Sequence, residues 1–179
     1  MKKIMFDDKY GLTDAVLEGR KTMTRRVIIN LDNYDVHNSI PTYKIGEEVA
    51  IAQKYLDLCN CDAFYEALHK SDPTFPLECI KYEKGCNNKM FVKAKWMPHR
   101  IRITDIKVER LQSISEDDVF KEGLELKDGL TCFETCDDHN VICSNDPRAA
   151  FAFLIDKLMG RGTWEKNPYV YAYEFRLIR

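Results

Sequence analysis

The chain has 179 residues, of which 45% are hydrophobic and 31% are charged, and its formal net charge is −2. This composition is typical of a globular domain and excludes a disordered or fibrous chain. The almost neutral total also excludes a polybasic coat protein for nucleic acid, although a local basic patch is compatible with it. Because no apolar run approaches ~20 residues and the N-terminus has no secretory signal, we expect a cytoplasmic protein without a membrane partner.

The N-terminal part predicts one helix and two strands. The apolar residues of 12–17 share one face of a helix that has Thr13 as its N-cap and stops at Gly19. The β-branched residues 27–29 predict a short strand. Residues 47–53 predict a second strand, with apolar side chains that need cover on both faces.

Two further strands are predicted in the middle of the chain. Residues 90–94 predict a short strand and residues 99–111 a long one, in which the apolar phase changes after Ile103. A strand with period two cannot keep both sets of apolar side chains on one face, so we expect a bulge at Thr104 and Asp105.

Two helices and a strand are predicted in the C-terminal part. Ser115 can cap a short helix that ends at Gly123, with acidic residues in its first turn. Residues 147–159 have the apolar stripe of a second helix. Residues 169–177 alternate strictly, with aromatic side chains at every second position, which predicts the closing strand.

The order of these elements predicts the fold class. Short strands, scattered helices and a long final strand favour an α+β protein, built as a mixed β-barrel with short helices packed around it, over a doubly wound sheet. We expect a single domain over residues 1–179. Within it, the turn-rich residues at about 54–88 and the irregular residues at about 124–145 are typical of insertions.

Residues 19–26, GRKTMTRR, contain four cations and two hydroxyl groups. Guanidinium and ammonium groups bind phosphate through charge-assisted hydrogen bonds, and threonine hydroxyls add further ones. The segment therefore predicts a basic pocket with ligand contacts from Arg20, Lys21, Arg25 and Arg26. Cations are also common at the C-terminal end of a helix, where the helix dipole favours them, so a solvated helix end is the alternative.

The same segment resembles the ASCH family signature G-x-K-x-x-T-x-R at Gly19, Lys21, Thr24 and Arg26. Residues 109–123 resemble the strand and acidic helix of that family, and residues 167–178 resemble its closing strand. The resemblance covers most of the chain outside the two expected insertions. It implies a PUA-like barrel whose pocket binds RNA, a nucleotide or a modified nucleoside.

One branch of this family, the small bacterial acetylcytidine amidohydrolases, uses a lysine, a threonine and a glutamate. The resemblance implies that Lys21, Thr24 and Glu122 hold these places. A threonine hydroxyl becomes a nucleophile when a base removes its proton, and a lysine can be that base if its pKa is lowered. Neighbouring arginines would lower it, since like charge disfavours the ammonium form.

A departure from the family concerns Gln53. Longer relatives have a glutamate at the end of a strand that resembles V-R-E-T-W, whereas this chain has IAQKY there. We expect Gln53 to contact the ligand, together with Gly19, Arg20, Arg25 and Arg26, without a role that needs charge.

Seven cysteines, an odd number, argue against a fully paired disulfide framework, so in a reducing compartment we expect free thiols. Cys132, Cys136, His139 and Cys143 nevertheless give the pattern C-x3-C-x2-H-x3-C, four possible zinc ligands. The spacing is unlike that of well-known zinc sites. We therefore expect no bound metal and no other cofactor.

Two functions from different classes stay open. The sequence alone favours a protein that binds RNA, a nucleotide or a nucleoside, because this function needs only the basic pocket at residues 19–26. The alternative is a metal-independent amidohydrolase that removes an acyl group from a modified nucleoside such as acetylcytidine. It needs Lys21, Thr24 and Glu122 to converge on one cavity. Neither hypothesis predicts a protein partner.

Overall fold

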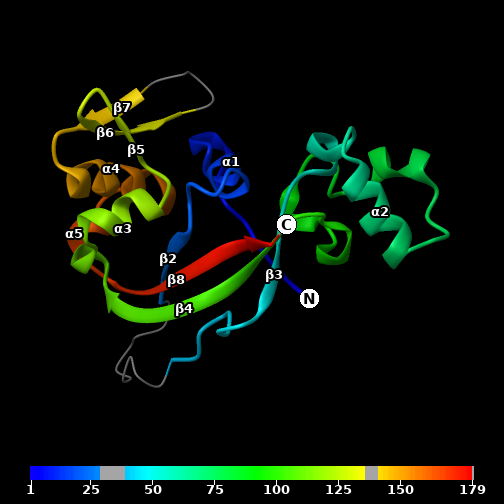
Figure 1. Cartoon of the computed structure of the whole chain (residues 1–179), viewed down its shortest axis with the longest axis horizontal. Helices are drawn as coiled ribbons and strands as arrows, with labels where there is room; N and C mark the ends of the chain where they lie inside the picture. Colours follow the sequence, from blue (N-terminus) through cyan, green and yellow to red (C-terminus); the bar gives the residue numbers. More distant parts are fainter. Residues whose placement is uncertain (29–38, 136–140, 179) are drawn as a thin grey trace. The chain divides into compact units, whose positions relative to one another are not determined.

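The computed structural model describes residues 1–28, 39–135 and 141–178 (Figure 1). The chain divides into two compact units. Unit 1 consists of Met1–Phe6, Glu48–Arg102 and Leu177–Arg179, and unit 2 consists of Asp7–Glu47 and Ile103–Arg176. Across the described residues, every helix is too short or too polar to pass through a lipid bilayer. The single-domain organisation stays a prediction.

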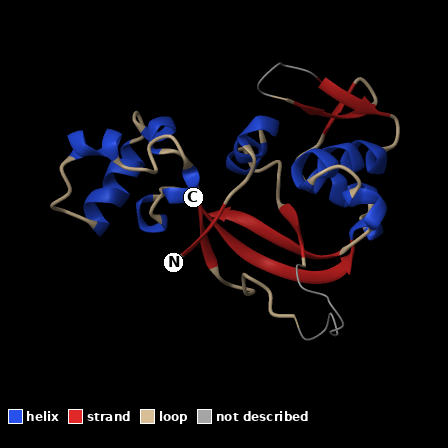
Figure 2. Ribbon diagram, turned by 180° about the vertical axis from the view of Figure 1, so that it is seen from behind, coloured by secondary structure: helices blue, strands red, loops and turns tan. Residues whose placement is uncertain are grey.

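The strands form two sheets (Figure 2). The larger sheet has the order β1-β3-β4-β8-β2, with bounds β1 (Lys2–Ile4), β2 (Met23–Val27), β3 (Glu48–Ile51), β4 (Arg100–Arg110) and β8 (Tyr169–Ile178). β1 is parallel to β3, whereas the pairs β3–β4 and β2–β8 are antiparallel. The smaller sheet is antiparallel and lies in unit 2, with strands β5 (Glu125–Lys127), β6 (Leu130–Glu134) and β7 (Val141–Ser144). The α+β class is therefore confirmed, and the pairings among the described strands leave β1 and β2 as open edges.

Unit 1 encloses a core of aromatic side chains. Its helical segments are η3 (Tyr55–Leu58), α2 (Asp62–Ser71), η4 (Leu77–Tyr82), η5 (Lys89–Phe91) and η6 (Ala94–Trp96). The ring of Tyr55 stacks on Phe64 with 5.6 Å between centroids, and it contacts Trp96 at 5.3 Å. All three rings are buried. Most of the buried residues of the first predicted insertion thus belong to one hydrophobic core, which also contains Ala50 of β3.

The strand predicted at residues 90–94 is wrong, because two 3-10 turns, η5 and η6, cover most of this segment. The Asn88 side chain accepts a hydrogen bond from the Met90 backbone N–H and starts the first turn. The carbonyls of Met90 and Val92 accept hydrogen bonds from Lys3 Nζ at 2.6 and 2.8 Å. A short apolar run fits a strand and a turn equally well, so its pattern does not distinguish them.

Burial raises the pKa of Tyr55 to about 12, because the phenolate would lose its hydration. Between pH 10, the ordinary tyrosine value, and 12, the folded chain keeps a proton that the unfolded chain has released. The free energy of unfolding should therefore fall as the pH rises through this window. Tyr55→Phe cannot ionise, so we expect it to lose this part of the pH dependence. Urea unfolding of both proteins from about pH 8 to 11 checks this, and parallel curves would refute it.

The predicted helices of unit 2 are confirmed as α1 (Leu12–Leu17), α3 (Glu116–Lys121) and α4 (Pro147–Met159). The shorter segments η1 (Asp8–Tyr10), η7 (Leu111–Ser113) and α5 (Thr163–Lys166) accompany them. Ser115 caps α3, and α4 packs against α3 and the smaller sheet (Figure 1). The cap predicted at Thr13 is wrong. Because η1 precedes the helix, Gly11 takes the cap position, and the Thr13 hydroxyl donates to Asp8 Oδ1 at 2.5 Å.

Strand β2 begins earlier than the β-branched residues predict. It covers Met23–Val27, so the second half of the cationic segment 19–26 lies in the strand. The cause is its pairing with β8, which places Met23 opposite Glu174 and Val27 opposite Val170. Backbone hydrogen bonds to a partner strand override a weak local preference. Residue 29, the last of the predicted strand, lies outside the described residues.

The closing strand is confirmed as β8, and the long strand as β4. β4 runs without interruption from Arg100 to Arg110. Ile101 and Ile103 are buried, whereas Val108 is 42% exposed. The second set of apolar side chains, Ile106 and Val108, is thus less buried than the first, and the bulge at Thr104 and Asp105 stays a prediction.

Cys132 and Cys143 form a disulfide bond between opposite residues of β6 and β7. The expectation of free thiols is therefore wrong for these two residues, because the sequence does not show which cysteines face each other across a strand pair. Their sulfurs cannot act as zinc thiolates while they are bonded to each other. The other residues of the pattern C-x3-C-x2-H-x3-C, Cys136 and His139, lie outside the described residues.

The disulfide is expected to stabilise unit 2 by restricting its unfolded chain. It closes a loop with a sequence separation of 11 residues, for which chain entropy gives about 3 kcal/mol at most. Alkylation of the denatured protein should label two more cysteines after reduction than before. An equal number of labelled cysteines in both samples would contradict the bond.

Candidate functional site

The turn between α1 and β2 holds Lys21 against the end of α3. Lys21 N donates to the Ala15 carbonyl, and Thr22 N donates to the Lys121 carbonyl, both at 2.8 Å. Gly123 permits this close approach, since its φ is +101° and a Cβ atom there would lie 3.2 Å from Lys21 Cβ. A larger residue would be strained and crowded at this position. Two segments that are far apart in the sequence are thereby joined.

Lys21 and Glu122 form a buried ion pair at this junction. Lys21 Nζ lies 2.6 Å from Glu122 Oε2, and it also donates to the Glu122 backbone carbonyl at 2.7 Å. The residues are only 2% and 4% exposed. The structure thus brings together two of the three residues that the family resemblance assigns to catalysis.

Arg25 lies next to this pair and holds three carboxylates. Its fully buried guanidinium contacts Glu109 Oε1 at 2.7 Å, Asp118 Oδ2 at 3.0 Å and Glu122 Oε1 at 3.1 Å. The two oxygens of Glu122 are therefore divided, Oε2 toward Lys21 and Oε1 toward Arg25. We call Lys21, Arg25, Glu109, Asp118 and Glu122 the buried ion cluster. It connects β2, β4 and the α3 region.

The surroundings of the two cations change their titration in opposite directions. Burial lowers the pKa of Lys21, because a buried ammonium loses its hydration, and the Glu122 carboxylate opposes this shift. The positive charges of Arg26 and Arg25 lower the Lys21 pKa further. For Arg25, burial also acts downward, but the carboxylates around it outweigh burial and raise its pKa. Lys21 is thus the cation of the cluster that releases a proton more readily.

Thr24 lies on the other face of β2. It is 5% exposed and lies opposite Tyr173, while Arg26 lies opposite Tyr171. Because side chains alternate along a strand, Thr24 and Arg26 share a face that Arg25 does not. The ring of Tyr173 also contacts Tyr43, with 5.3 Å between centroids. The structure thus shows that Thr24 is buried and that it lies opposite Tyr173 in the strand pair. A contact of Thr24 with Lys21 and Glu122 stays a prediction.

For the remaining predicted ligand contacts, the structure shows exposure and contacts within the protein. Gly19 and Arg20 are exposed, and Arg20 pairs with Glu18 at 2.6 Å and with Glu125 at 2.7 Å. Gln53 belongs to unit 1, where its Oε1 lies 2.7 Å from His99 Nδ1. The ligand-binding role of these residues stays a prediction.

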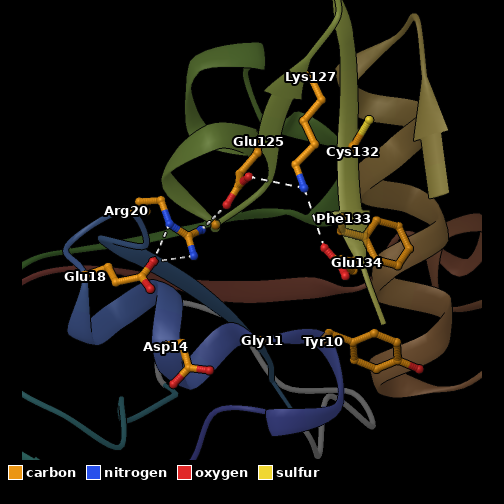
Figure 3. A pocket seen from close by; sticks show the side chains of 11 residues that line it. Tyr10, Gly11, Asp14, Glu18, Arg20, Glu125, Lys127, Cys132, Phe133 and Glu134 are labelled. Carbon is orange, nitrogen blue, oxygen red and sulfur yellow. Dashed lines mark hydrogen bonds and ion pairs between the residues drawn. The ribbon is translucent and has the colours of Figure 1, made fainter. Parts of the chain in front are cut away.

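A cavity of about 290 Å³ shares Gly123 with the Lys21 environment (Figure 3). Four acidic and two basic residues line it, namely Asp14, Glu18, Glu125, Glu134, Arg20 and Lys127. The basic residues are already paired: Arg20 lies between Glu18 and Glu125, and Lys127 lies 3.6 Å from both Glu125 and Glu134. The surplus of carboxylates disfavours a phosphate in this cavity.

Sequence reasoning missed Glu109 and Asp118. Acidic residues are favoured in the first turn of a helix, so the start of α3 already explains Asp118 and the sequence does not point to an ion partner for it. Glu109 lies in a strand that alternates between polar and apolar residues. Their common partner, Arg25, is buried in β2, which pairs with β8, and a buried guanidinium requires carboxylate partners. No local sequence pattern predicts this pairing.

Comparisons with known proteins give little information on this site. No family model matches the chain, and no curated protein matches it. Among solved structures, it is similar to protein EF3133 from Enterococcus faecalis V583, which is described as DUF984. The identity is 14% and the TM-score is 0.45, with 99% of this chain and 80% of that chain covered. A likeness at this level carries no argument about family or activity.

Proposed function

We propose that the chain is a metal-independent amidohydrolase that removes an acyl group from a modified nucleoside such as acetylcytidine. Lys21, Thr24 and Glu122 are its proposed catalytic residues. The observation that carries the proposal is the buried contact of 2.6 Å between Lys21 Nζ and Glu122 Oε2. Burying two charges costs free energy, and groups whose pKa is shifted by burial and a specific partner are concentrated at functional sites.

The proposed roles follow from the chemistry of the pair. A neutral lysine amine has two hydrogens and one lone pair. The two hydrogens suit the two Glu122 oxygens that Lys21 contacts, which leaves the lone pair to accept a proton from the Thr24 hydroxyl. The lowered pKa of Lys21 favours this neutral form.

The reaction divides into two steps. In the first, Lys21 takes the proton of Thr24 Oγ1, the oxygen attacks the acyl carbonyl carbon, and the bond from carbon to the cytosine amino nitrogen breaks. The departing nitrogen takes the proton back from Lys21, and the acyl group stays on Thr24 as an ester. In the second step, water attacks the ester, Lys21 accepts and returns one proton, and acetate leaves. The sum is acetylcytidine and water converted to cytidine and acetic acid.

We also propose that the chain is a cytoplasmic ASCH protein with a PUA-like barrel, although the Cys132–Cys143 disulfide is a bond that a reducing compartment disfavours. This proposal is supported by the place of the signature residues Gly19, Lys21, Thr24 and Arg26, which span the junction from α1 to β2. The mixed five-stranded sheet would supply the strands of such a barrel, whereas the described pairings leave β1 and β2 as open edges.

Binding of RNA or a nucleotide without hydrolysis is the second candidate. The specific observation in its favour is the face of β2 that combines the half-buried Arg26 with Tyr171 and Tyr173. Aromatic rings stack on bases and arginine binds phosphate, but Tyr171 and Tyr173 are only 7% and 1% exposed, so a base would reach them only if this face opened. Against it, Arg20, Lys21 and Arg25 already pair with carboxylates, so three of the four cations of residues 19–26 are neutralised.

The experiment that separates the two candidates is incubation of the purified protein with acylated and unmodified nucleosides in the presence of a chelator. Mass spectrometry then follows substrates and products. The proposal expects acetylcytidine to be converted to cytidine and acetate at an undiminished rate in the chelator. Binding of the nucleoside without any product would support the second candidate instead.

A further inference from the structure

Unit 1 has an exposed aromatic patch that takes no part in the proposed reaction. Tyr82 is 78% exposed and Phe91 51%, and the neighbouring Met90 is 59% exposed. Among the described residues, Phe153 is the one other exposed phenylalanine, tyrosine or tryptophan. Single exposed apolar residues are normal on a protein surface, but two exposed rings within ten residues are a concentration that needs an explanation.

Lysine side chains accompany both rings. Lys81 Nζ lies 5.1 Å from the centroid of the Tyr82 ring, and Lys84 Nζ lies 5.9 Å from that of the Phe91 ring. Lys84 follows Tyr82 by two residues and reaches the Phe91 ring, so the two rings belong to one region of the surface. We call Lys81, Tyr82, Lys84, Met90 and Phe91 the 81–91 patch.

The charge of this region differs from that of the whole chain. Residues 77–95 contain five lysines and two glutamates, a net charge of +3, whereas the whole chain has −2. One of the glutamates, Glu83, lies 3.8 Å from Lys93. The positive charge is therefore gathered on the segment that also exposes the aromatic rings, which is the charge complementary to a phosphate backbone.

We propose that the 81–91 patch binds single-stranded nucleic acid. Bases stack on the Tyr82 and Phe91 rings, and Lys81 and Lys84 bind the adjacent phosphates. In the unbound protein each lysine ammonium group lies over an aromatic ring. When a nucleic acid binds, a base stacks on the face of the ring and the lysine moves to contact the phosphate. A duplex is disfavoured because its base faces are already stacked on each other.

A protein partner fits this patch less well. The buried cores of protein interfaces are depleted in lysine, whereas here each exposed ring has its own lysine. The proposal does not depend on the amidohydrolase reaction, because none of the residues of the patch belongs to the buried ion cluster. Its failure would leave the deacylation reaction untouched, and the reverse also holds.

The test is fluorescence anisotropy of the full chain with a labelled oligouridylate of about 12 nucleotides, an unstructured probe of suitable length. The double variant Tyr82→Ala/Phe91→Ala should weaken binding at least about tenfold, because each ring stacks one base. Lys81→Ala/Lys84→Ala should lower the slope of log affinity against log salt by about 1.4 between about 50 and 200 mM salt, since each lost phosphate contact counts about 0.7. The exposed Phe153→Ala and Lys157→Ala are the matched controls and should bind like the wild type.

Single-stranded DNA of matched length should bind similarly and a duplex more weakly, because neither a ring face nor a lysine reads the 2′-hydroxyl. Thermal unfolding checks that the variants keep their fold. We expect them to keep it, because the replaced side chains are exposed. Absence of binding by the wild type at low salt overturns the proposal. Equal weakening of binding in the patch variants and in the Phe153→Ala control also overturns the proposal. Binding that does not depend on salt overturns it as well, because that is the behaviour of an apolar protein-docking surface.

Discussion

Replacing Glu122 by glutamine is expected to lower kcat/KM for the deacylation of acetylcytidine by about a thousandfold, the middle of the range for loss of a general acid–base partner. The amide keeps the shape of the side chain but removes the negative charge that contacts Lys21 at 2.6 Å and Arg25 at 3.1 Å. Without that charge, Lys21 loses its carboxylate partner, whereas Arg25 keeps Glu109 and Asp118. Lys21 is then no longer held in position to exchange a proton with Thr24. Steady-state kinetics with product detection by mass measures the effect.

The matched control for this variant is Glu125→Gln. Glu125 lies three residues further along the chain, but it pairs with the exposed Arg20 outside the buried ion cluster. Its replacement should leave kcat/KM almost unchanged. Similar rates for the wild type and Glu122→Gln would contradict a catalytic role of Glu122.

The pH dependence of the rate gives a second check on the same pair. Because the proposed base is the neutral form of Lys21, the rate should rise as the pH rises through the lysine pKa. Burial lowers this pKa from the ordinary value of 10.5, so the rise should be centred below that value. Lys21→Met should abolish the rise together with most of the activity.

Replacing Arg25 by methionine is expected to lower the free energy of unfolding by about 3 to 5 kcal/mol. Its guanidinium is the common partner of Glu109, Asp118 and Glu122, and the Arg25 side chain is fully buried. Methionine fills much of the volume but removes the cation that the three carboxylates share, so that among the described cations Glu122 keeps only Lys21 and Asp118 keeps only Lys121. Urea unfolding at neutral pH, followed by circular dichroism, measures the loss.

Arg20→Met is the matched control for the stability measurement. Arg20 also pairs with two carboxylates, but its side chain is 39% exposed. Surface ion pairs contribute little, so this variant should lose less than about 1 kcal/mol. An Arg25→Met protein as stable as Arg20→Met would show that the cluster does not hold β2, β4 and α3 together.

The elements that the sequence predicts well are those whose limits are set by neighbouring residues. α3 starts at the Ser115 cap and ends before Gly123, and α4 starts with Asp146 as cap and Pro147 as first residue. β8 is visible because its side chains alternate over ten residues. Capping and alternation act within a few residues, so a single sequence contains them.

The features that the sequence does not predict depend on distant partners. The start of β2 is fixed by β8, and the disulfide by the register that places Cys132 opposite Cys143. The turns at residues 89–96 are held in part by Lys3, which is far away in the chain. In each case the deciding contact joins segments whose proximity the local pattern does not contain.

The candidate site divides in the same way. The family resemblance names Lys21 and Glu122, and the structure places them in contact. It does not name Glu109 or Asp118, and it treats Arg25 as a ligand contact, whereas its guanidinium is buried among carboxylates. A resemblance carries residue types from a motif, but ion partners from three separate elements become visible only in three dimensions.

The most direct test of the proposed reaction is the search for the acyl-enzyme itself. Wild-type protein is mixed with excess acetylcytidine, quenched in acid within the first turnover, and its mass and peptide fragments are measured. The account predicts one additional acetyl group, located on Thr24 and absent from Thr24→Ala, while Thr22→Ala still acquires it. Release of cytidine by Thr24→Ala at the wild-type rate, or an acetyl group on another residue, would contradict the account.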